Sequence, residues 1–258
     1  MYVGTPSSGG RILQLRPPPG LLSNAAFWLS FVLIYQVVQA GADPDRRAAL
    51  ADSARVMNLE RHISGRLLEL DAQRLVHTSS FLNGAAALVY WCSEFAVVGL
   101  ALLWVYLRRR SAFGRMRNTL IAAGLIALVG CYLFPTAPPR ALARLGFVDT
   151  LAQAHSLNGG HGLLPLPSNQ FAAMPSVHSA DALIVGVGLA LLVRSKAAKI
   201  LWLLWPPTVW FCVMATANHF WLDVLGGIGA AAIAALAVWI TSELWRSRRT
   251  ALPQTTAQ

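Results

Sequence analysis

Charged side chains are scarce in this 258-residue sequence: 12% of the residues are Asp, Glu, Lys or Arg, whereas 55% are hydrophobic. A soluble domain usually carries about 25% charged residues, so much of this surface is not expected to face water. The net charge of +10 does not indicate nucleic-acid binding, because the basic residues stand in short clusters between apolar runs. That arrangement is typical of a membrane protein.

Cysteine is also rare, and its placement argues against two further classes of protein. The three cysteines, Cys92, Cys131 and Cys212, all lie inside apolar runs. An odd number without short spacing does not indicate a disulfide framework or a thiolate metal site. We also expect no cleavable signal peptide, because the polar N-terminal stretch leads into an apolar run with no small-residue cleavage site after it.

Six apolar runs predict membrane-spanning helices, since about 20 apolar residues cross a bilayer. They cover residues 21–40, 83–107, 119–134, 175–193, 200–217 and 224–240. We therefore expect an all-α, six-span transmembrane helix bundle. It forms a single domain, residues 21–245, between cytoplasmic tails at 1–20 and 246–258.

The basic residues predict the orientation of this bundle, because cytoplasmic loops are enriched in Lys and Arg. With the N-terminus inside, thirteen of the 21 basic residues fall in cytoplasmic segments, and both lysines are among them. We therefore expect a multi-pass protein of the cell membrane with both termini in the cytoplasm. Segments 43–81 and 135–174 are then extracytoplasmic.

These two outer segments differ in pattern. Segment 43–81 has apolar residues at helical spacing, which predicts one or two amphipathic helices that lie on the membrane surface or cap the bundle; they are Leu59, Ile63, Leu67, Leu70 and Leu75. Segment 135–174 is rich in Pro, Gly and Asn and is predicted to be a loop, with turns at 158–160 and 165–167.

Two histidines occupy special positions at the predicted outer ends of spans. His178 follows Pro175 and Ser176, which predict a helix start because proline is tolerated in the first helical turn. Such a start offers free backbone N–H groups for a phosphate, and Ser176 adds a hydroxyl donor. In the first turn, His178 can protonate a departing oxygen.

The second histidine, His219, stands four residues before Asp223. On a helix these positions share one face, so the carboxylate can accept a hydrogen bond from the imidazole and fix its tautomer. An imidazole held in this way can attack phosphorus and form a phosphohistidine. An acid at the start of an apolar helix is costly, which also favours a functional role for Asp223.

These residues carry a family resemblance. Pro175-Ser176-Val177-His178 and His219-x-x-x-Asp223 resemble two motifs of the type 2 phosphatidic acid phosphatase (PAP2) superfamily. The surrounding residues, Met174, Ser179 and Asn218-His219-Phe220, are most similar to the inositol phosphorylceramide synthase-like (inositolphosphotransferase) branch. The resemblance implies a PAP2-type enzyme that acts on a lipid phosphate or phospholipid with His219 as nucleophile, Asp223 as its orienter and His178 as general acid. It implies no cofactor and no metal.

The sequence departs from the superfamily pattern at two phosphate-binding cations. The lysine of the first motif is absent, and Val213 stands where the third motif has an arginine. Something must still neutralise the phosphate. Arg140, which follows a proline-rich stretch after the third span, is the first candidate; Arg61 and Arg144 are the second and third.

Three further interpretations stay open at this stage. Glu94, an acid deep in a span, either holds a partner such as Asn118 or lines a cavity. Asp181, three residues after His178, is a candidate to orient that ring. A zinc site made from His178, His219 and Asp223 is another interpretation, although no short-spaced His or Cys pair supports it.

We therefore predict an integral membrane phosphotransferase that moves a phosphoryl group or phospho-headgroup from a lipid donor to a hydroxyl acceptor through a phosphohistidine. The active site is expected at the extracytoplasmic face. The first alternative is hydrolysis of a lipid or polyprenyl phosphate, which the missing cations disfavour. The second is a non-enzymatic transporter or assembly factor. A transporter typically has broken helices in matching halves, which the sequence does not predict.

Overall fold

The computed structural model of the protein describes residues 20–42, 45–157 and 169–251. Within these ranges the chain forms helices and loops, with a single isolated β-bridge between Thr136 and Ala172. The helices are α1 (Leu21–Gly41), α2 (Arg46–Ser64), α3 (Leu68–Val76), α4 (Ser80–Glu94), α5 (Ala96–Arg108), α6 (Arg110–Leu133), η1 (Pro139–Ala141), η2 (Ala143–Leu145), α7 (Thr150–Leu157), α8 (Val177–Leu192), α9 (Lys196–Ala215) and α10 (Trp221–Ala251).

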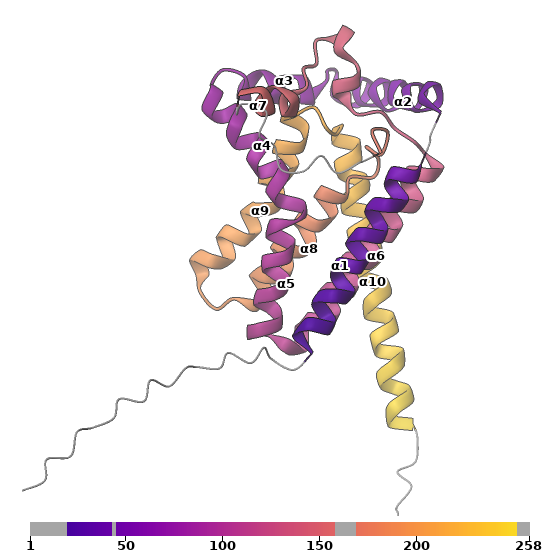
Figure 1. The fold of residues 1–258 in the computed structure, drawn as a ribbon, viewed down its shortest axis with the longest axis vertical. Helices are drawn as coiled ribbons and strands as arrows, with labels where there is room; N and C mark the ends of the chain where they lie inside the picture. The colour runs from indigo at the N-terminus through magenta and orange to yellow at the C-terminus, as the bar shows by residue number, and fades with distance from the viewer. Residues whose placement is uncertain (1–19, 43–44, 158–168, 252–258) are drawn as a thin grey trace, which may run out of the picture.

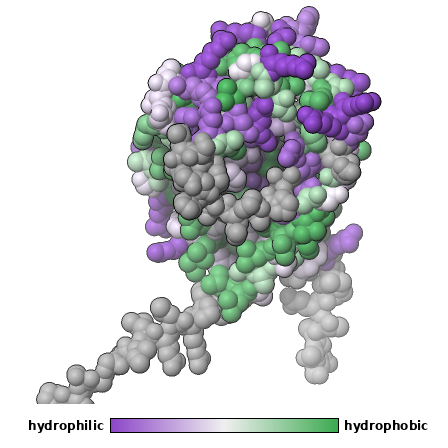
Figure 2. Space-filling model, turned by 45° about the horizontal axis from the view of Figure 1, so that its top comes forward, coloured by the Kyte–Doolittle hydropathy of each residue, from purple (hydrophilic) through white to green (hydrophobic). Residues whose placement is uncertain are grey.

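The helices form a bundle with two different ends. Helices α2, α3 and α7 lie across one end, whereas the α5–α6 and α8–α9 junctions and the C-terminal part of α10 lie at the other (Figure 1). Hydrophilic residues gather over the end that α2 and α3 cover, and hydrophobic residues dominate the surface below it (Figure 2). We call α2 and α3 together the cap.

Several helices are long and apolar enough to cross a membrane, which makes this a membrane protein. Helices α1, α6 and α9 qualify, as does α10 over Trp221–Arg248. The pair α4 and α5 qualifies together, with a bend of 46° between them, and α8 is shorter, with 16 residues. The described helices thus provide four spans, or five with the bent pair, and the sixth stays a prediction.

The span predicted over 83–107 corresponds to the bent pair α4 and α5 and not to one continuous helix. The chain breaks at Phe95, between α4 and α5. Apolar periodicity continues on both sides of the break, so the sequence pattern did not reveal it.

Small residues bring the central helices close together. Ala123, Ala180, Ala231 and Ala234, from α6, α8 and α10, form one buried cluster. At Gly227 a Cβ atom would lie 2.2 Å from the carbonyl oxygen of Ser176, so only glycine permits this approach. The first residues of α8 are therefore packed directly against the backbone of α10.

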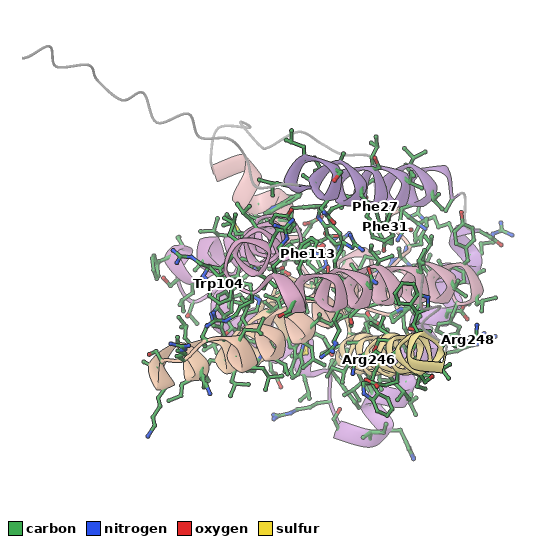
Figure 3. All side chains as sticks on the ribbon, turned by 90° about the horizontal axis from the view of Figure 1, so that it is seen from below. Phe27, Phe31, Trp104, Phe113, Arg246 and Arg248 are labelled. Carbon is green, nitrogen blue, oxygen red and sulfur yellow. The ribbon has the colours of Figure 1, made fainter. Side chains whose placement is uncertain are left out.

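Helix α1 stands at the edge of the bundle, beside α6 (Figure 3). Phe27 and Phe31 lie between these two helices, and the ring of Phe31 closely approaches Gly124 of α6. None of the residues in the apolar window of α1 is buried inside the protein. Most of the surface of α1 is therefore available to lipid.

The cap is helical as predicted for segment 43–81, and most of the apolar positions that indicated amphipathic helices point outward. Leu59, Ile63 and Leu75 are 50%, 59% and 57% exposed, whereas Val56, Leu67 and Val76 are buried. The buried face of the cap also carries five polar residues, namely Asp52, Ser53, Glu60, Glu69 and Gln73.

Hydrogen bonds to loops explain why these polar side chains are buried. The Gln73 side chain donates to the Val148 carbonyl and accepts from the Val148 N–H, at 2.8 and 3.0 Å. The Ser53 hydroxyl donates to the Ala137 carbonyl at 2.8 Å. Buried polar groups are stable when they are paired in this way. The loop predicted over 135–174 also contains the helix α7, while its predicted turns at 158–160 and 165–167 lie outside the described residues.

Candidate active site

His178 lies in the first turn of α8, at the bundle end that faces the cap. The helix begins at Val177, and Ser176 is its N-cap: the Ser176 hydroxyl oxygen accepts from the Ser179 N–H at 3.3 Å. The Ser176 side chain is fully buried. This capping role accounts for the local structure. It gives no direct support to the predicted contact of Ser176 with a phosphate.

His219 lies in the turn between α9 and α10, and not on a helix as the four-residue spacing suggested. The turn passes through Ala217, whose φ of 56° lies in the left-handed region. The His219 Nδ1 atom is 2.8 Å from the carbonyl oxygen of Ala173. A carbonyl only accepts, so Nδ1 carries the proton and Nε2 keeps its lone pair. This tautomer is the one that a nucleophilic Nε2 requires.

Asp223 is fully buried in the first turn of α10. Its Oδ2 atom accepts from the Phe220 N–H at 2.8 Å, as in a capping box, and lies 3.6 Å from His219 Nδ1. The direct hydrogen bond of His219 therefore goes to Ala173, while the predicted orienter stands at ion-pair distance. The sequence did not reveal the Ala173 carbonyl, because every residue has one.

The structure brings the two histidines together. The centroids of the His178 and His219 rings are 5.8 Å apart, and Tyr90 of α4 stacks on His178 with its centroid at 4.3 Å. A single phosphate group can contact both rings at this separation. Both histidines are buried, so such a group would be held away from bulk water.

Glu94 is the partner of His178. Its Oε2 atom lies 3.3 Å from His178 Nε2. Glu94 is the last residue of α4, so the bend at Phe95 sets the position of this carboxylate. The interpretation with Asn118 as the partner is wrong, since Asn118 binds Arg117 instead.

The other nitrogen of His178, Nδ1, is buried and has no hydrogen-bond partner among the described residues. Asp181, predicted as a candidate to orient this ring, is buried on the same helix and lines a neighbouring cavity.

Arg140 is placed beside the turn that carries His219. Its backbone N–H donates to the Ala217 carbonyl at 2.9 Å, and its Nη1 group donates to the Asn218 side-chain oxygen. Its Nε atom is 3.8 Å from a carboxylate oxygen of Asp149. Backbone and side-chain contacts thus hold Arg140 to Ala217 and Asn218, the two residues before His219.

The two other arginine candidates are placed differently. Arg61, on α2, and Arg144, on η2, both have exposed side chains. Within the described part of the chain, neither makes a hydrogen bond or ion pair with the histidine pair.

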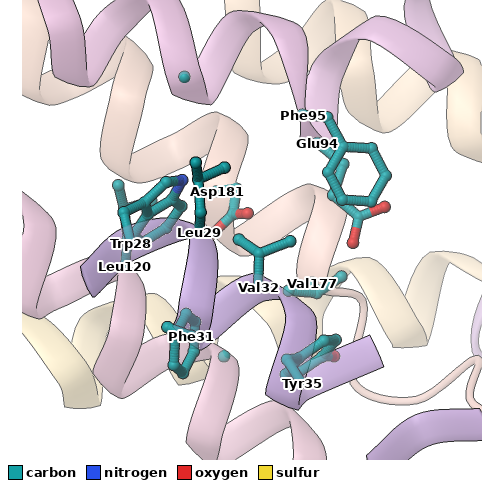
Figure 4. Close-up of a pocket in the computed structure, with 12 residues that line it drawn as sticks. Trp28, Leu29, Phe31, Val32, Tyr35, Glu94, Phe95, Leu120, Val177 and Asp181 are labelled. Carbon is teal, nitrogen blue, oxygen red and sulfur yellow. The ribbon is translucent and has the colours of Figure 1, made fainter. Parts of the chain in front are cut away.

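A cavity of about 190 Å³ lies between α1, the bent α4–α5 pair, α6 and α8 (Figure 4). Its wall is mostly apolar, with Trp28, Phe31 and Tyr35 contributed by α1. Glu94 and Asp181 also line it. Neither histidine lines the cavity, and Glu94 is the lining residue that contacts His178.

Among the described residues, no group of three or more His, Cys, Asp or Glu residues has the arrangement of a metal site.

Residues 54–249 match the family model of the PAP2 superfamily, and the protein therefore belongs to that superfamily. The match begins in α2, so it includes both histidine motifs, the bent α4–α5 pair and Arg140. Membership supports a lipid phosphatase or phosphotransferase type of function on lipid phosphates in membranes. No curated protein and no solved structure matches the chain significantly.

Proposed function

We propose that the protein is a lipid phosphotransferase that works through a phosphohistidine on His219. The observation that carries this proposal is the pair of buried histidine rings, 5.8 Å apart, in a PAP2-superfamily chain, with Arg140 bound to the residue before His219. The tautomer of His219 supports its role as nucleophile, because the Ala173 carbonyl holds the proton on Nδ1.

In the first step, the lone pair of His219 Nε2 attacks phosphorus and forms the P–N bond. The bond between phosphorus and the leaving oxygen breaks, and protonated His178 transfers its proton to that oxygen. Glu94 occupies His178 Nε2, so Nδ1 is the nitrogen that serves the leaving group. The positive charge that develops on His219 is stabilised by the Ala173 carbonyl and by Asp223.

In the second step, a hydroxyl acceptor attacks the phosphohistidine. Neutral His178 takes the proton of the attacking hydroxyl, the P–N bond breaks, and its electron pair returns to His219 Nε2. This reverses the proton transfer of the first step, as microscopic reversibility requires. If water is the acceptor, the same sequence is hydrolysis.

Arg140 is the group we propose for the phosphate oxygens. A guanidinium can donate two parallel hydrogen bonds to a phosphate. The contact of Arg140 with Asn218 ties this charge to the residue directly before His219. Ser176, Arg61 and Arg144 stay predictions for further phosphate contacts, and the buried N-cap role of Ser176 weakens its candidacy.

The cavity behind His178 supports a lipid as the substrate. Its apolar wall suits an acyl or prenyl chain, and one of its lining residues, Glu94, contacts His178. The two missing superfamily cations favour transfer, and the residues around both motifs resemble the inositolphosphotransferase branch. We therefore propose a phospho-headgroup donor and a polyol or other hydroxyl acceptor.

The test is a headgroup-exchange assay with purified protein in lipid vesicles. Phosphatidylinositol and phosphatidic acid serve as labelled donors, each with and without a polyol acceptor. Phosphate moved from phosphatidic acid to the polyol, or inositol phosphate moved from phosphatidylinositol to the polyol, supports transfer. Free phosphate or free inositol phosphate, respectively, in both conditions supports the phosphatase alternative. No turnover of either donor, together with no acid-labile phosphoenzyme, would leave the non-enzymatic alternative.

We also propose that the cap and the histidines are extracytoplasmic, with both chain termini inside. The support is the excess of basic residues in segments at the opposite end of the bundle, among them Arg108, Arg109 and Arg110. The test is cysteine labelling from outside the cell. Ala143→Cys, at the cap end, should react, and Ser111→Cys should not. The reverse pattern would contradict this orientation.

A further inference from the structure

Two glutamates of the cap are buried against the active-site helix. Glu60 of α2 and Glu69 of α3 have no exposed surface, although a carboxylate is one of the groups that is hardest to bury. They come from different helices, and they interact with each other. Neither has a role in the two-step reaction above, so their burial needs another explanation.

Both glutamates end on the first turn of α10. A carboxylate oxygen of Glu69 accepts from the Trp221 N–H at 2.7 Å, and one of Glu60 accepts from the Leu222 N–H at 2.8 Å. The preceding N–H, of Phe220, is bound by Asp223. The first N–H groups of a helix have no partner within the helix, and here three successive ones are bound by carboxyl oxygens.

The second oxygen of each glutamate has no hydrogen-bond partner from any other described residue. Two ionised carboxylates in such a place would repel each other, so one of them must be protonated and donate to the other. Burial, and then the charge of Glu69, raise the pKa of Glu60 to about 9. Burial also raises the pKa of Glu69.

We propose that Glu60 and Glu69 are a proton-sharing pair of positioning residues, which holds the first turn of α10, and with it Asp223 and the His219 turn, in the reactive arrangement. A shared proton lets two carboxyl groups bind two adjacent N–H groups with one net negative charge, which the helix dipole favours. The cap then supports the active site by holding the first turn of α10, without touching the substrate.

The charged groups that act on the pair are all acids. Asp223 of α10 raises the pKa of both glutamates, in addition to their effect on each other. The basic residues closest in sequence, Arg61 and Arg66, have exposed side chains. Loss of the shared proton therefore adds a second negative charge beside Asp223 with no buried counter-charge in the described structure.

The direction of the pH effect follows from the raised pKa. The contribution of Glu60 to stability is complete below its ordinary pKa of about 4.5 and is lost as the pH rises through about 9. We expect Tm of the wild type to fall as the pH rises from about 4.5 to about 9 and to level off above that, whereas kcat should fall near pH 9, where the folded pair loses its proton. The inference rests on the proposed function only for the kcat measurement, since Tm requires no catalysis.

The experiment compares Glu60→Gln and Glu69→Gln with Glu60→Ala and Glu69→Ala in the full-length protein in lipid vesicles. Glutamine keeps an oxygen for the backbone N–H and supplies a permanent donor, so either glutamine variant should keep kcat at neutral pH and lose the alkaline decline. Each alanine variant leaves buried groups unpaired, and we expect kcat to fall roughly tenfold or more. The matched control is Glu243→Gln, an exposed acid near the far end of α10.

Two results would overturn the inference. One is an alkaline decline of kcat and Tm in both glutamine variants that equals that of the wild type. The other is wild-type kcat in a folded alanine variant. If the wild type shows no phosphoester turnover at all, the proposed function fails, while the Tm profiles of the glutamine variants still decide the role of the pair.

Discussion

The histidine cluster and the cap lie at the same end of the bundle, and both bury polar groups, but they pair them differently. In the cap, Gln73, Ser53, Glu60 and Glu69 end on backbone groups of loops and of α10. The second oxygens of Glu60 and Glu69 have no partner from any other described residue, and in the proposed pair they share a proton. In the histidine cluster, formed by His178, His219 and Asp223, His178 Nδ1 and one oxygen of Asp223 have no hydrogen-bond partner among the described residues. Paired polar groups stabilise a structure, whereas unpaired ones remain available for a substrate.

The largest expected effect separates the two histidines of the cluster. His219→Ala should lower kcat by on the order of 10⁶ on lipid and activated aryl phosphates alike, because the nucleophile is lost. His178→Ala should lose lipid turnover but keep turnover of p-nitrophenyl phosphate, since p-nitrophenolate leaves without a proton. The measurement is steady-state kinetics on both substrates, with trapping of acid-labile phosphoenzyme in His178→Ala.

If His219→Ala still hydrolyses the aryl phosphate and His178→Ala does not, the two roles are reversed. If neither substitution changes turnover, the cluster is not catalytic.

The next largest effect is expected for the charge of Arg140. Arg140→Ala should reduce kcat/KM by roughly 10²–10³, because a phosphate in a site shielded from water loses a charged donor. The controls are Arg61→Ala and Arg144→Ala, whose side chains are exposed. A larger loss in either control than in Arg140→Ala would move the phosphate contact to that arginine.

A smaller effect is expected at Gly227, where the start of α8 packs against α10. Gly227→Ala places a methyl group 2.2 Å from the Ser176 carbonyl oxygen, so α8 and α10 must separate. We expect a destabilisation of about 1–3 kcal/mol, measured as a lower Tm. Gly229→Ala, on the same helix with no atom within 4 Å of the added Cβ, should stabilise by about 0.5–1 kcal/mol. Equal Tm values for the two variants would contradict the close approach of α8 and α10.

The smallest effect is expected on the outer face of the cap. Leu59→Ala and Ile63→Ala should each change the free energy of unfolding by no more than about 0.5 kcal/mol, because both side chains are exposed. Val56→Ala, a buried position on the same helix, should cost more. Unfolding measurements in one detergent provide the comparison, and a larger loss at Leu59 than at Val56 would show that the apolar face of α2 does pack inward.

The sequence predicted the helical class and both histidine motifs, because long apolar runs and local spacing carry this information directly. It did not predict the inward face of the cap. Apolar periodicity assumes that the buried face of a helix is the apolar one. In the cap, Glu60, Glu69 and Gln73 are buried because unpaired N–H and C=O groups of distant segments require partners, and no local pattern records those partners.

The sequence by itself determined that this is a membrane protein of the PAP2 superfamily, with His178 and His219 as the candidate residues. These properties follow from composition and from short motifs. Only the tertiary structure decided that Glu94 contacts His178, that Ala173 holds the His219 proton, and that the pair Glu60 and Glu69 caps α10. Each of these contacts joins residues from separate segments of the chain, so their relative positions depend on how the helices bend and pack.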